Sequence, residues 1–326
     1  MRLGVIGGGG MATYHAYNTT RIPHCTLVAM GSPEFSDAAR NVAQHAAASC
    51  VDDAAAVYTR NDIDAVIIAT PTDTHAAVAI AAMQHGKHVF VEKPLARTLS
   101  DASAIIEASI RYQRHLMTGH VVRYFADYAQ AHQLVTSGAI GRPGVARTNR
   151  CGAFPGDGRH WYADLQRSGG VLLDLIVHDY DWLRWTFGAP DRIYARGLLT
   201  AGFDRKDAAM SIVHFANGVI AYAEASWAYP NGFRTSLEVS GSAGLIHHAN
   251  DDVADIALNA FPNTAATLAT DSDGHEDPYL AQLRDFVTWC GGGQAPRSVA
   301  EDGYAALRMS LAAIESVHTG RAVSLT

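Results

Sequence analysis

The sequence has few of the features that mark secreted, membrane-spanning or metal-binding proteins. Its four cysteines, Cys25, Cys50, Cys151 and Cys290, are widely spaced and form no C-x-x-C or metal-ligand pattern, so we expect reduced thiols without disulfides. No apolar run reaches the about 18 uncharged residues of a membrane span, and no charged-then-apolar signal opens the chain. We therefore expect a cytoplasmic protein with no membrane partner.

Charge is also scarce. Only 17% of the residues are charged, and the net charge of -7 comes from 25 Lys+Arg against 32 Asp+Glu without a basic cluster, which argues against nucleic acid as a partner. There is no low-complexity tract or internal repeat, and 48% hydrophobic content is typical of an ordered globular protein. At 326 residues the chain exceeds the roughly 250–300 residues of a single core, so we expect two domains.

Short strand-like segments alternate with alanine-rich helical segments over the first 120 residues. The helical pattern is clearest over 73–84 and 101–114. Strands alternating with helices of this length form βαβ units, which predicts a parallel sheet covered by helices on both faces. Residues 1–120 are therefore expected to be a doubly wound, dinucleotide-binding domain. The expected strands are Leu3–Gly7, Thr26–Met30, Ala65–Thr70, His88–Lys93 and Leu116–Gly119, with a weaker one near Cys50.

Beyond residue 120 the pattern changes to period-2 strands. Segments 211–215 and 219–226 are joined by Ala216-Asn217-Gly218, whose Asn-Gly pair can supply the positive φ angles of a tight hairpin. We therefore expect residues 121–326 to form a second domain around antiparallel strands. A capping box from Ser298 to Glu301 predicts a final helix over 299–318 that packs back near the first domain.

The first strand leads into a glycine-rich turn that fits the pattern G-x-G-x-x-A. Gly7 would allow the tight turn, Gly9 would let the backbone approach a pyrophosphate, and Ala12 would allow close packing of helix and strand. The helix that starts near Gly10 and Met11 would point its N-terminus at the phosphates. The alternative is a glycine-rich turn that binds no ligand.

The end of the second strand lacks the acidic residue that usually binds the ribose of NAD. Gly31 and Ser32 stand in its place, so no carboxylate there would repel a 2'-phosphate, and the Ser32 hydroxyl could bind one. No Arg or Lys follows until Arg40, and Glu34 could reach the ribose instead. The cofactor is expected to be NAD or NADP, with a slight preference for NADP.

The fifth strand ends in Glu92-Lys93-Pro94. Ligands bind at the carboxyl edge of an open parallel sheet, so Lys93 would lie beside the reactive ring of a dinucleotide. The alternative is a surface lysine before a turn-forming proline.

The apolar segment GGVLLDLIVHDYDWLRW, residues 169–185, carries several charged groups. Offsets of four and seven predict that Asp174, His178 and Asp181 share one face of a helix, while Asp179 points elsewhere and is expected to be solvated or to cap a neighbouring element. A buried Asp–His pair with a purely structural role is one alternative. A metal site is another, but no third ligand is evident from the spacing, so no metal is expected.

Several ordered motifs resemble the Gfo/Idh/MocA family of NAD(P)-dependent oxidoreductases over nearly the whole chain. The resemblance implies an α/β protein with an N-terminal Rossmann domain over residues 1–120. It also implies that residues 121–326 are a substrate-binding and oligomerisation domain, an α/β domain with an open, mostly antiparallel sheet that commonly builds homodimers or homotetramers. The motifs are GGGGMATYHA, Ala69-Thr-Pro-Thr-Asp-Thr-His75, Glu92-Lys93-Pro94, Gly169-Gly170 with Asp174-x-x-x-His178, NGVIAYAEASW, and EDGYAALRMSLAAIESVHTGRAV.

The resemblance also implies roles for individual residues. Lys93, Asp174 and His178 match the family's catalytic residues, and Asp181 matches a contact to a substrate hydroxyl. In that mechanism the imidazole takes a hydroxyl proton while a hydride moves to the nicotinamide. Neutral histidine suits this near pH 7.

Further residues are implied near the cofactor and the substrate. The alternative for His75 is a surface residue at a helix start, and the substrate-pocket residues could equally be ordinary packing. Cofactor-lining residues would include Thr70, Pro71, His75, Glu92 and Lys93. Residues that could line the substrate pocket are Arg123, Tyr124 and Trp161.

The leading hypothesis is a dehydrogenase or reductase acting on a polyol, cyclitol or sugar. Two alternatives on the same fold are a non-catalytic NAD(P)-binding sensor and an NAD-dependent glycosidase. A sensor has no chemical need for both Lys93 and His178, so their joint presence favours an enzyme.

Overall fold

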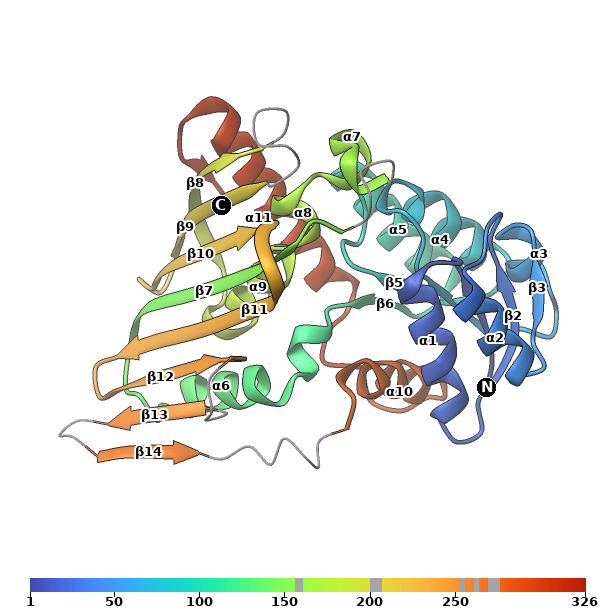
Figure 1. Ribbon diagram of the computed structural model, residues 1–326, viewed down its shortest axis with the longest axis horizontal. Helices are drawn as coiled ribbons and strands as arrows, with labels where there is room; N and C mark the ends of the chain where they lie inside the picture. Colours follow the sequence, from blue (N-terminus) through green and yellow to red (C-terminus); the bar gives the residue numbers. More distant parts are fainter. Residues whose placement is uncertain (156–160, 200–206, 252–255, 261–263, 269–275) are drawn as a thin grey trace. The chain divides into compact units, whose positions relative to one another are not determined.

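A computed structural model describes residues 1–155, 161–199, 207–251, 256–260, 264–268 and 276–326. The chain divides into two compact units (Figure 1): Met1–Tyr124 with Glu276–Tyr304, and Phe125–His275 with Ala305–Thr326. The first unit is thus assembled from two stretches far apart in sequence, whereas the sequence-based division gave every residue after 120 to the second domain.

The first unit is built on a six-stranded parallel sheet in the order β3-β2-β1-β4-β5-β6. The sheet confirms the parallel, doubly wound prediction, including the weak strand near Cys50. The strands are β1 (Arg2–Ile6), β2 (Thr26–Gly31), β3 (Ser49–Val51), β4 (Ala65–Ile68), β5 (His88–Glu92) and β6 (Leu116–Gly119).

Helices connect these strands and cover the sheet. The helical elements are α1 (Gly10–Arg21), α2 (Asp37–His45), α3 (Ala55–Tyr58), η1 (Thr72–Thr74), α4 (His75–Gln84), α5 (Leu99–Tyr112), η2 (Val121–Tyr124) and α10 (Pro278–Cys290). The side chain of Asp277 caps α10 by accepting a hydrogen bond from Tyr279 N, and Pro278 opens the helix where a missing N–H costs nothing.

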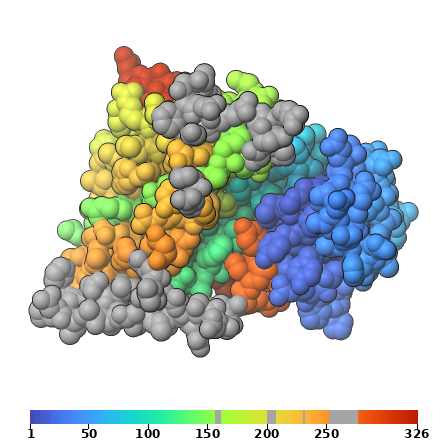
Figure 2. Space-filling view, viewed as in Figure 1, coloured from blue at the N-terminus to red at the C-terminus, as the bar shows by residue number. Residues whose placement is uncertain are grey.

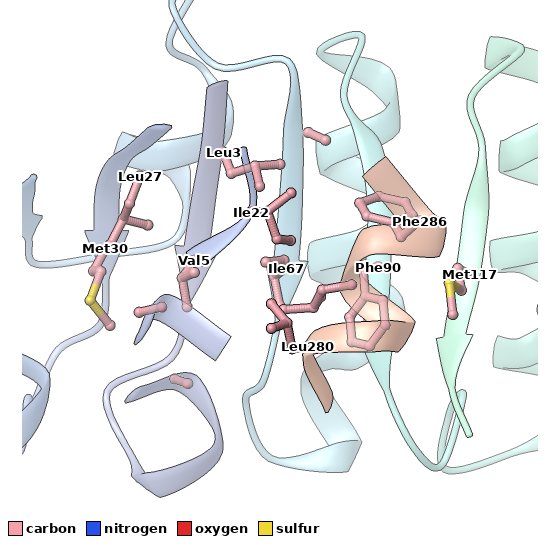
Figure 3. Close-up of a cluster of buried hydrophobic side chains, with 14 of the residues drawn as sticks. Leu3, Val5, Ile22, Leu27, Met30, Ile67, Phe90, Met117, Leu280 and Phe286 are labelled. Carbon is pink, nitrogen blue, oxygen red and sulfur yellow. The ribbon is translucent and has the colours of Figure 1, made fainter. Parts of the chain in front are cut away.

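Helix α10 supplies part of the core of the first unit (Figure 3). Phe90 and Ile67 from the sheet cluster with Leu280 and Phe286 from α10, all of them buried. Burying each such side chain stabilises the fold by roughly 1.5–3 kcal/mol. The surface of α1 lies next to that of α10 in the space-filling view, blue beside orange-red (Figure 2). Helix α10 was not predicted from the sequence.

The second unit is built on a mixed sheet with nine strands among the described residues, in the order β14-β13-β12-β11-β7-β10-β9-β8-β15. Among the strands that the structure describes, only β7 and β10 pair in parallel; the other pairs are antiparallel, as predicted. The strands are β7 (Pro143–Ala153), β8 (Pro190–Leu198), β9 (Ala208–Phe215), β10 (Ile220–Ser226), β11 (Ala228–Gly241), β12 (Gly244–Ala249), β13 (Ile256–Ala260), β14 (Thr264–Leu268) and β15 (Val323–Ser324).

The predicted hairpin between β9 and β10 is confirmed, but its turn differs in detail. Gly218 alone adopts a positive φ, of 91°. The side chain of Asn217 instead accepts a hydrogen bond from Val219 N and donates one to Phe187 O. Asparagine here braces the turn through its side chain, so the expectation of two positive φ angles is wrong.

Helices cover one face of this second sheet (Figure 1). Two side-chain hydrogen bonds anchor α9: Tyr180 Oη donates to Ser211 Oγ on β9, and Trp182 Nε1 donates to the carbonyl of Tyr128 on α6. The helical elements are α6 (Ala126–Thr136), η3 (Trp161–Ala163), α7 (Leu165–Ser168), α8 (Val171–Asp174) and α9 (Val177–Phe187).

The final helix, α11 (Ala300–Thr319), is confirmed and stops at Gly320, where φ is 71°. Its predicted capping box is wrong. The Ser298 hydroxyl donates instead to the carbonyl of Thr118 on β6, and the Asp302 carboxylate accepts from Val299 N. Ser298 therefore bonds to a buried carbonyl near the end of β6 and does not cap the helix. No helix within the described ranges is long and apolar enough to cross a membrane.

Candidate active site

The turn between β1 and α1 is shaped by glycines. Gly7 has a φ of 133°, and a Cβ there would lie 2.4 Å from the carbonyl oxygen of Ala69 and 3.0 Å from the Cβ of Ala12. Ala12 is fully buried. The close approach of the helix to the end of β4 therefore requires glycine at position 7 and a small residue at position 12, as the pattern predicted.

Gly8 is equally constrained, although the pattern treats it as a free position. A Cβ on Gly8 would lie 1.9 Å from the carbonyl oxygen of Glu34. The run of four glycines was the sequence signal that could have identified it.

The start of α1 is open. A Cβ on Gly9 or Gly10 would meet nothing within 4 Å, and both glycines and Met11 are exposed. The helix has no side-chain cap and no acidic residue in its first turn. An exposed helix start without a side-chain cap, together with the positive end of the helix dipole, fits the pyrophosphate of a dinucleotide.

The turn after β2 uses the Ser32 hydroxyl internally. Ser32 Oγ donates to the carbonyl of Glu34 at 2.5 Å and accepts from Glu34 N at 3.3 Å. The Glu34 residue is exposed, and the guanidinium of Arg40 lies over the ring of Phe35, 5.4 Å from its centroid. The hydroxyl hydrogen of Ser32 is therefore already engaged within the turn.

Two strand ends meet at His75. This histidine is 1% exposed, so it is not the surface residue that one reading expected. Its Nδ1 lies 2.9 Å from the carbonyl of Pro94, after β5, and its Nε2 lies 3.0 Å from the carbonyl of Thr70, after β4. Burial lowers the pKa of His75 against the pull of both carbonyls. A neutral ring has a single N–H and can donate it to only one of these two carbonyls at a time, while the ring itself packs between the two strand ends.

The segment carrying Lys93 is also held from the other side. Glu92 Oε2 accepts a hydrogen bond from Lys93 N at 3.1 Å, and Glu92 Oε1 lies 2.6 Å from Nε2 of His15 on α1. Burial opposes ionisation of Glu92, but the hydrogen bond from His15 and the charges of His15 and Lys93 outweigh it, and its pKa is lowered. Glu92 was predicted from the sequence as a site residue, whereas His15 was not.

In the second unit, two glycines shape the turn that leads to Asp174. Gly169 and Gly170 have φ values of 73° and 67°, and a Cβ on Gly169 would lie 2.3 Å from a methyl carbon of Leu173. The carbonyl of Gly170 accepts the hydrogen bond of Asp174 N. The double glycine therefore starts the short helix α8, which ends at Asp174.

The predicted single helix over residues 169–185 is wrong. It breaks between α8 and α9 at Leu175 and Ile176, where Ile176 N donates to the carbonyl five residues earlier, that of Val171. Periodicity alone does not show this break, because both residues at the break are apolar and buried. Asp174 thus ends one helix while His178 and Asp181 share the next, three residues apart, with Asp174 and Asp181 buried and His178 half-buried.

Asp179 is neither solvated nor a cap, which corrects that expectation. It is fully buried, and its Oδ2 accepts from Nε of Arg150 on β7 at 2.6 Å. The Arg150 guanidinium also lies over the rings of Tyr128 and Phe233. The ion pair fixes the first turn of α9, which carries His178, to the sheet. The partner lies 29 residues away, which is why local pattern could not reveal it.

The three other substrate-pocket candidates lie in different surroundings. Arg123 is 2% exposed and donates to the carbonyl of Arg297 and to Asp302, while the Tyr124 hydroxyl accepts from Arg297 N. These contacts favour the packing alternative for both. Trp161 is half-buried and stacks on Tyr162 at 4.0 Å between ring centroids.

Within the described residues, no group of three or more His, Cys, Asp and Glu side chains is placed to hold a metal ion.

The strand order of the first unit, with the glycine turn at the carboxyl end of β1 and on the same edge as the ends of β4 and β5, defines a dinucleotide-binding domain of the Rossmann type. Residues 1–120 match the oxidoreductase-family model with an NAD-binding Rossmann fold, and residues 128–247 match the Gfo/Idh/MocA C-terminal domain. The chain belongs to the Gfo/Idh/MocA family of oxidoreductases.

The chain is similar to known enzymes along its whole length. It is 29% identical to the myo-inositol 2-dehydrogenase of Thermotoga maritima, covering 100% of this chain and 98% of that protein. It is also 29% identical to the scyllo-inositol 2-dehydrogenase (NAD(+)) of Bacillus subtilis, covering 100% and 96%. A levoglucosan dehydrogenase, solved with NADH and L-sorbose, shares the fold with a TM-score of 0.89 at 23% identity, covering 100% and 99%.

Proposed function

We propose that this protein transfers a hydride between a nicotinamide dinucleotide and a secondary alcohol or ketone of a polyol, cyclitol or sugar. The observation that carries the proposal is the place of Lys93, directly after β5 at the carboxyl edge of the parallel sheet and on the same edge as the open glycine turn. The inositol dehydrogenases to which the chain is similar support this class of substrate.

The chain's own residues would divide the work as follows. The bound dinucleotide would supply or accept the hydride. The first amides of α1, at Gly10 and beyond, would hold its phosphates. Lys93 would donate a hydrogen bond to the reacting oxygen and stabilise its developing negative charge.

His178 would take the hydroxyl proton, with Asp174 orienting the imidazole and Asp181 binding a second hydroxyl. Lys93 belongs to the first unit and His178 to the second.

For the cofactor, we propose that NAD serves and that NADP is also accepted. The B. subtilis relative carries NAD(+) in its name. The absence of a carboxylate at Ser32 leaves nothing at that position to repel a 2'-phosphate, which was the reason for the slight preference for NADP. However, the Ser32 hydroxyl is engaged by Glu34, and Arg40 lies over Phe35, so neither offers NADP a clear advantage.

A substrate panel tests the proposal. Polyols, cyclitols, aldoses and their keto forms would be assayed at 340 nm with NAD(H) and NADP(H) in parallel. We expect turnover with at least one cyclitol or sugar. Cofactor binding without turnover on any panel member would favour the sensor alternative. Release of a sugar from a glycoside without net change at 340 nm would favour the glycosidase.

We also propose that the chain forms a homodimer or homotetramer through the outer face of the second sheet. On that face Met210, Ile212 and Ile220 are 40–49% exposed, and Tyr222 pairs with Ile212 across neighbouring strands. A contiguous exposed apolar patch is typical of an interface. Light scattering should give a multiple of the 34.8 kDa chain mass, and Ile212→Lys should lower it. A monomeric wild type would contradict the proposal.

A further inference from the structure

Lys93 is connected to the dinucleotide-binding helix through two buried side chains. His15 on α1 is fully buried, Glu92 at the end of β5 is 7% exposed, and His15 Nε2 lies 2.6 Å from Glu92 Oε1. The other carboxylate oxygen accepts from Lys93 N. One carboxylate thus joins the helix and the backbone of the lysine.

The surroundings of this pair are built to hold it. Phe90 and Glu92 are two residues apart on β5 and therefore share a face, and the His15 ring meets Phe90 edge-on at 5.2 Å. Gly119 lies opposite Glu92 on β6, and a Cβ there would approach Glu92 Oε1 to 3.3 Å and Phe90 to 3.0 Å. Glycine at this position leaves room for the carboxylate.

The hydrogen in the short contact can be assigned from its partners. Glu92 is ionised, so it accepts at both oxygens, and His15 must donate from Nε2. Nδ1 of His15 has no hydrogen-bond partner among the described residues. Among the described residues the ring therefore makes one hydrogen bond, to Glu92, whose other carboxylate oxygen accepts from Lys93 N.

We propose that His15 and Glu92 are positioning residues that couple occupation of the start of α1 to the placement of Lys93. His15 lies five residues after Gly10, about 7.5 Å along a stiff helix from the amides that face the phosphates. A small shift of α1 on binding a dinucleotide is thereby transmitted to Glu92 and to the backbone of Lys93. This coupling rests on the proposed function for its catalytic meaning.

Three variants separate positioning from packing. His15→Phe keeps an aromatic ring against Phe90 but removes the donor. His15→Gln restores an N–H that can reach Glu92. Tyr14→Phe is the matched control, because Tyr14 lies on the same helix and its hydroxyl donates to Asp277 at the start of α10, not to β5.

Steady-state kinetics give the first readout. We expect His15→Phe to lower kcat about 10- to 100-fold while the KM for the alcohol and the Kd for the dinucleotide change less than about threefold, since a misplaced group costs rate more than binding. His15→Gln should recover most of the rate, and Tyr14→Phe should match the wild type. If kcat fell equally in His15→Phe and His15→Gln, in proportion to the fall in their melting temperatures, the role of His15 and Glu92 would be packing alone.

Lysine labelling gives a readout that needs no turnover. The chain has three lysines, Lys87, Lys93 and Lys206. Lys87 is 6% exposed and donates to the carbonyls of Arg60 and Ile63, so it reports unfolding, while Lys206 lies outside the described residues. Pulse acetylation followed by peptide mass spectrometry measures Lys93 by itself.

In the wild type, saturating NAD should change the acetylation rate of Lys93 at least about threefold, and in His15→Phe this response should be largely lost while Lys87 stays slow. An undiminished response in His15→Phe at full NAD saturation would overturn the coupling. A wild type that turns over no panel substrate would instead overturn the proposed function, and the labelling result would still stand.

Discussion

Lys93 and His178 are held in place in two different ways. Lys93 follows a strand whose pairing within a parallel sheet fixes where it ends. The segment is also held by the Nδ1 of His75, which lies 2.9 Å from the carbonyl of Pro94, and by the Glu92 carboxylate, which accepts a hydrogen bond from Lys93 N. His178 lies in the first turn of a helix whose start is fixed by the buried ion pair between Asp179 and Arg150. The first arrangement depends on strand register and the second on a distant partner, so the two should respond differently to mutation.

The largest effect should come from removing the lysine itself. Lys93→Ala should lower kcat by about 10³-fold, because the charge that stabilises the developing alkoxide is lost. Cofactor affinity should stay within about threefold, since the phosphates are held elsewhere. Steady-state kinetics and NAD titration by fluorescence measure the two quantities. Unchanged turnover would sink the catalytic assignment.

Removing the histidine should cost somewhat less rate but change its pH dependence. His178→Asn should lower kcat roughly 10²-fold or more, because a positioned general base is lost. The pH profile of kcat between 5.5 and 8.5 should lose its limb near neutral pH. A variant with the wild-type profile would count against the role as base.

The ion pair that holds α9 should matter chiefly for stability. Asp179→Asn removes a buried charge opposite Arg150 and should lower the free energy of unfolding by about 3 kcal/mol, because a broken buried pair leaves a poorly solvated charge. Glu238→Gln is the matched control: its partner Arg147 is 54% exposed, so the loss should be under about 1 kcal/mol. Calorimetric melting compares the two. Equal shifts would show that burial of the pair is not what holds α9.

The glycine turn offers a test of binding without a change in fold. Gly9→Ala meets no neighbour, so its melting temperature should be unchanged, but the added methyl group should raise the Kd for NAD at least about tenfold by blocking close approach of the pyrophosphate. Gly8→Ala should instead lower stability, since its Cβ would meet the carbonyl of Glu34. Wild-type affinity in Gly9→Ala would place the phosphates elsewhere.

The smallest effect concerns the edge of the first sheet at which β5 begins, opposite to the edge that carries Lys93. There His88 stacks on His115, which lies against Trp289, and His88 Nδ1 accepts from His115 N. Burial, with the charges of His115 and Arg114, lowers the pKa of His88 from 6.5 to about 4.

The unfolded chain therefore binds a proton at His88 that the folded chain does not, between about pH 6.5 and 4. Stability from this site is complete above pH 6.5 and is lost as the pH falls through that window, by roughly 1 kcal/mol after allowing for its partial exposure. His88→Asn keeps an acceptor for His115 N and removes the titration. Urea denaturation at pH 7 and pH 4.5 measures how far the free energy of unfolding falls with acid, and this fall should be smaller in the variant than in the wild type. An equal fall in both proteins would assign the acid sensitivity to other groups.

The features that could be predicted from the sequence are those that depend on local pattern. The sheet of the first unit, its glycine turn and the strand end at Lys93 were predictable, because strand periodicity and turn chemistry are local. The antiparallel character of the second sheet followed in the same way.

Features made by distant pairing were not predictable. The break between α8 and α9 falls at two apolar residues, Leu175 and Ile176, so the apolar pattern does not indicate it. Asp179 was expected to be solvated because its ion-pair partner, Arg150, is distant in sequence. His15 likewise looked like any other polar residue of α1, because its partner, Glu92, is 77 residues away. Helix α10 was not predicted because the strands that it packs against lie nearly two hundred residues earlier in the sequence.

That helix has a consequence for how the chain is made. The hydrophobic face that carries Phe90 and Ile67 is complete only when Leu280 and Phe286 have been synthesised. A ribosome at residue 120 has therefore produced every strand of the first sheet but not its full cover, and it must add strands β7 to β14 of the second sheet before the remainder arrives. The first unit cannot simply be cut out at residue 120 as a stand-alone dinucleotide-binding module; a usable one would need Glu276–Tyr304 joined back by a linker.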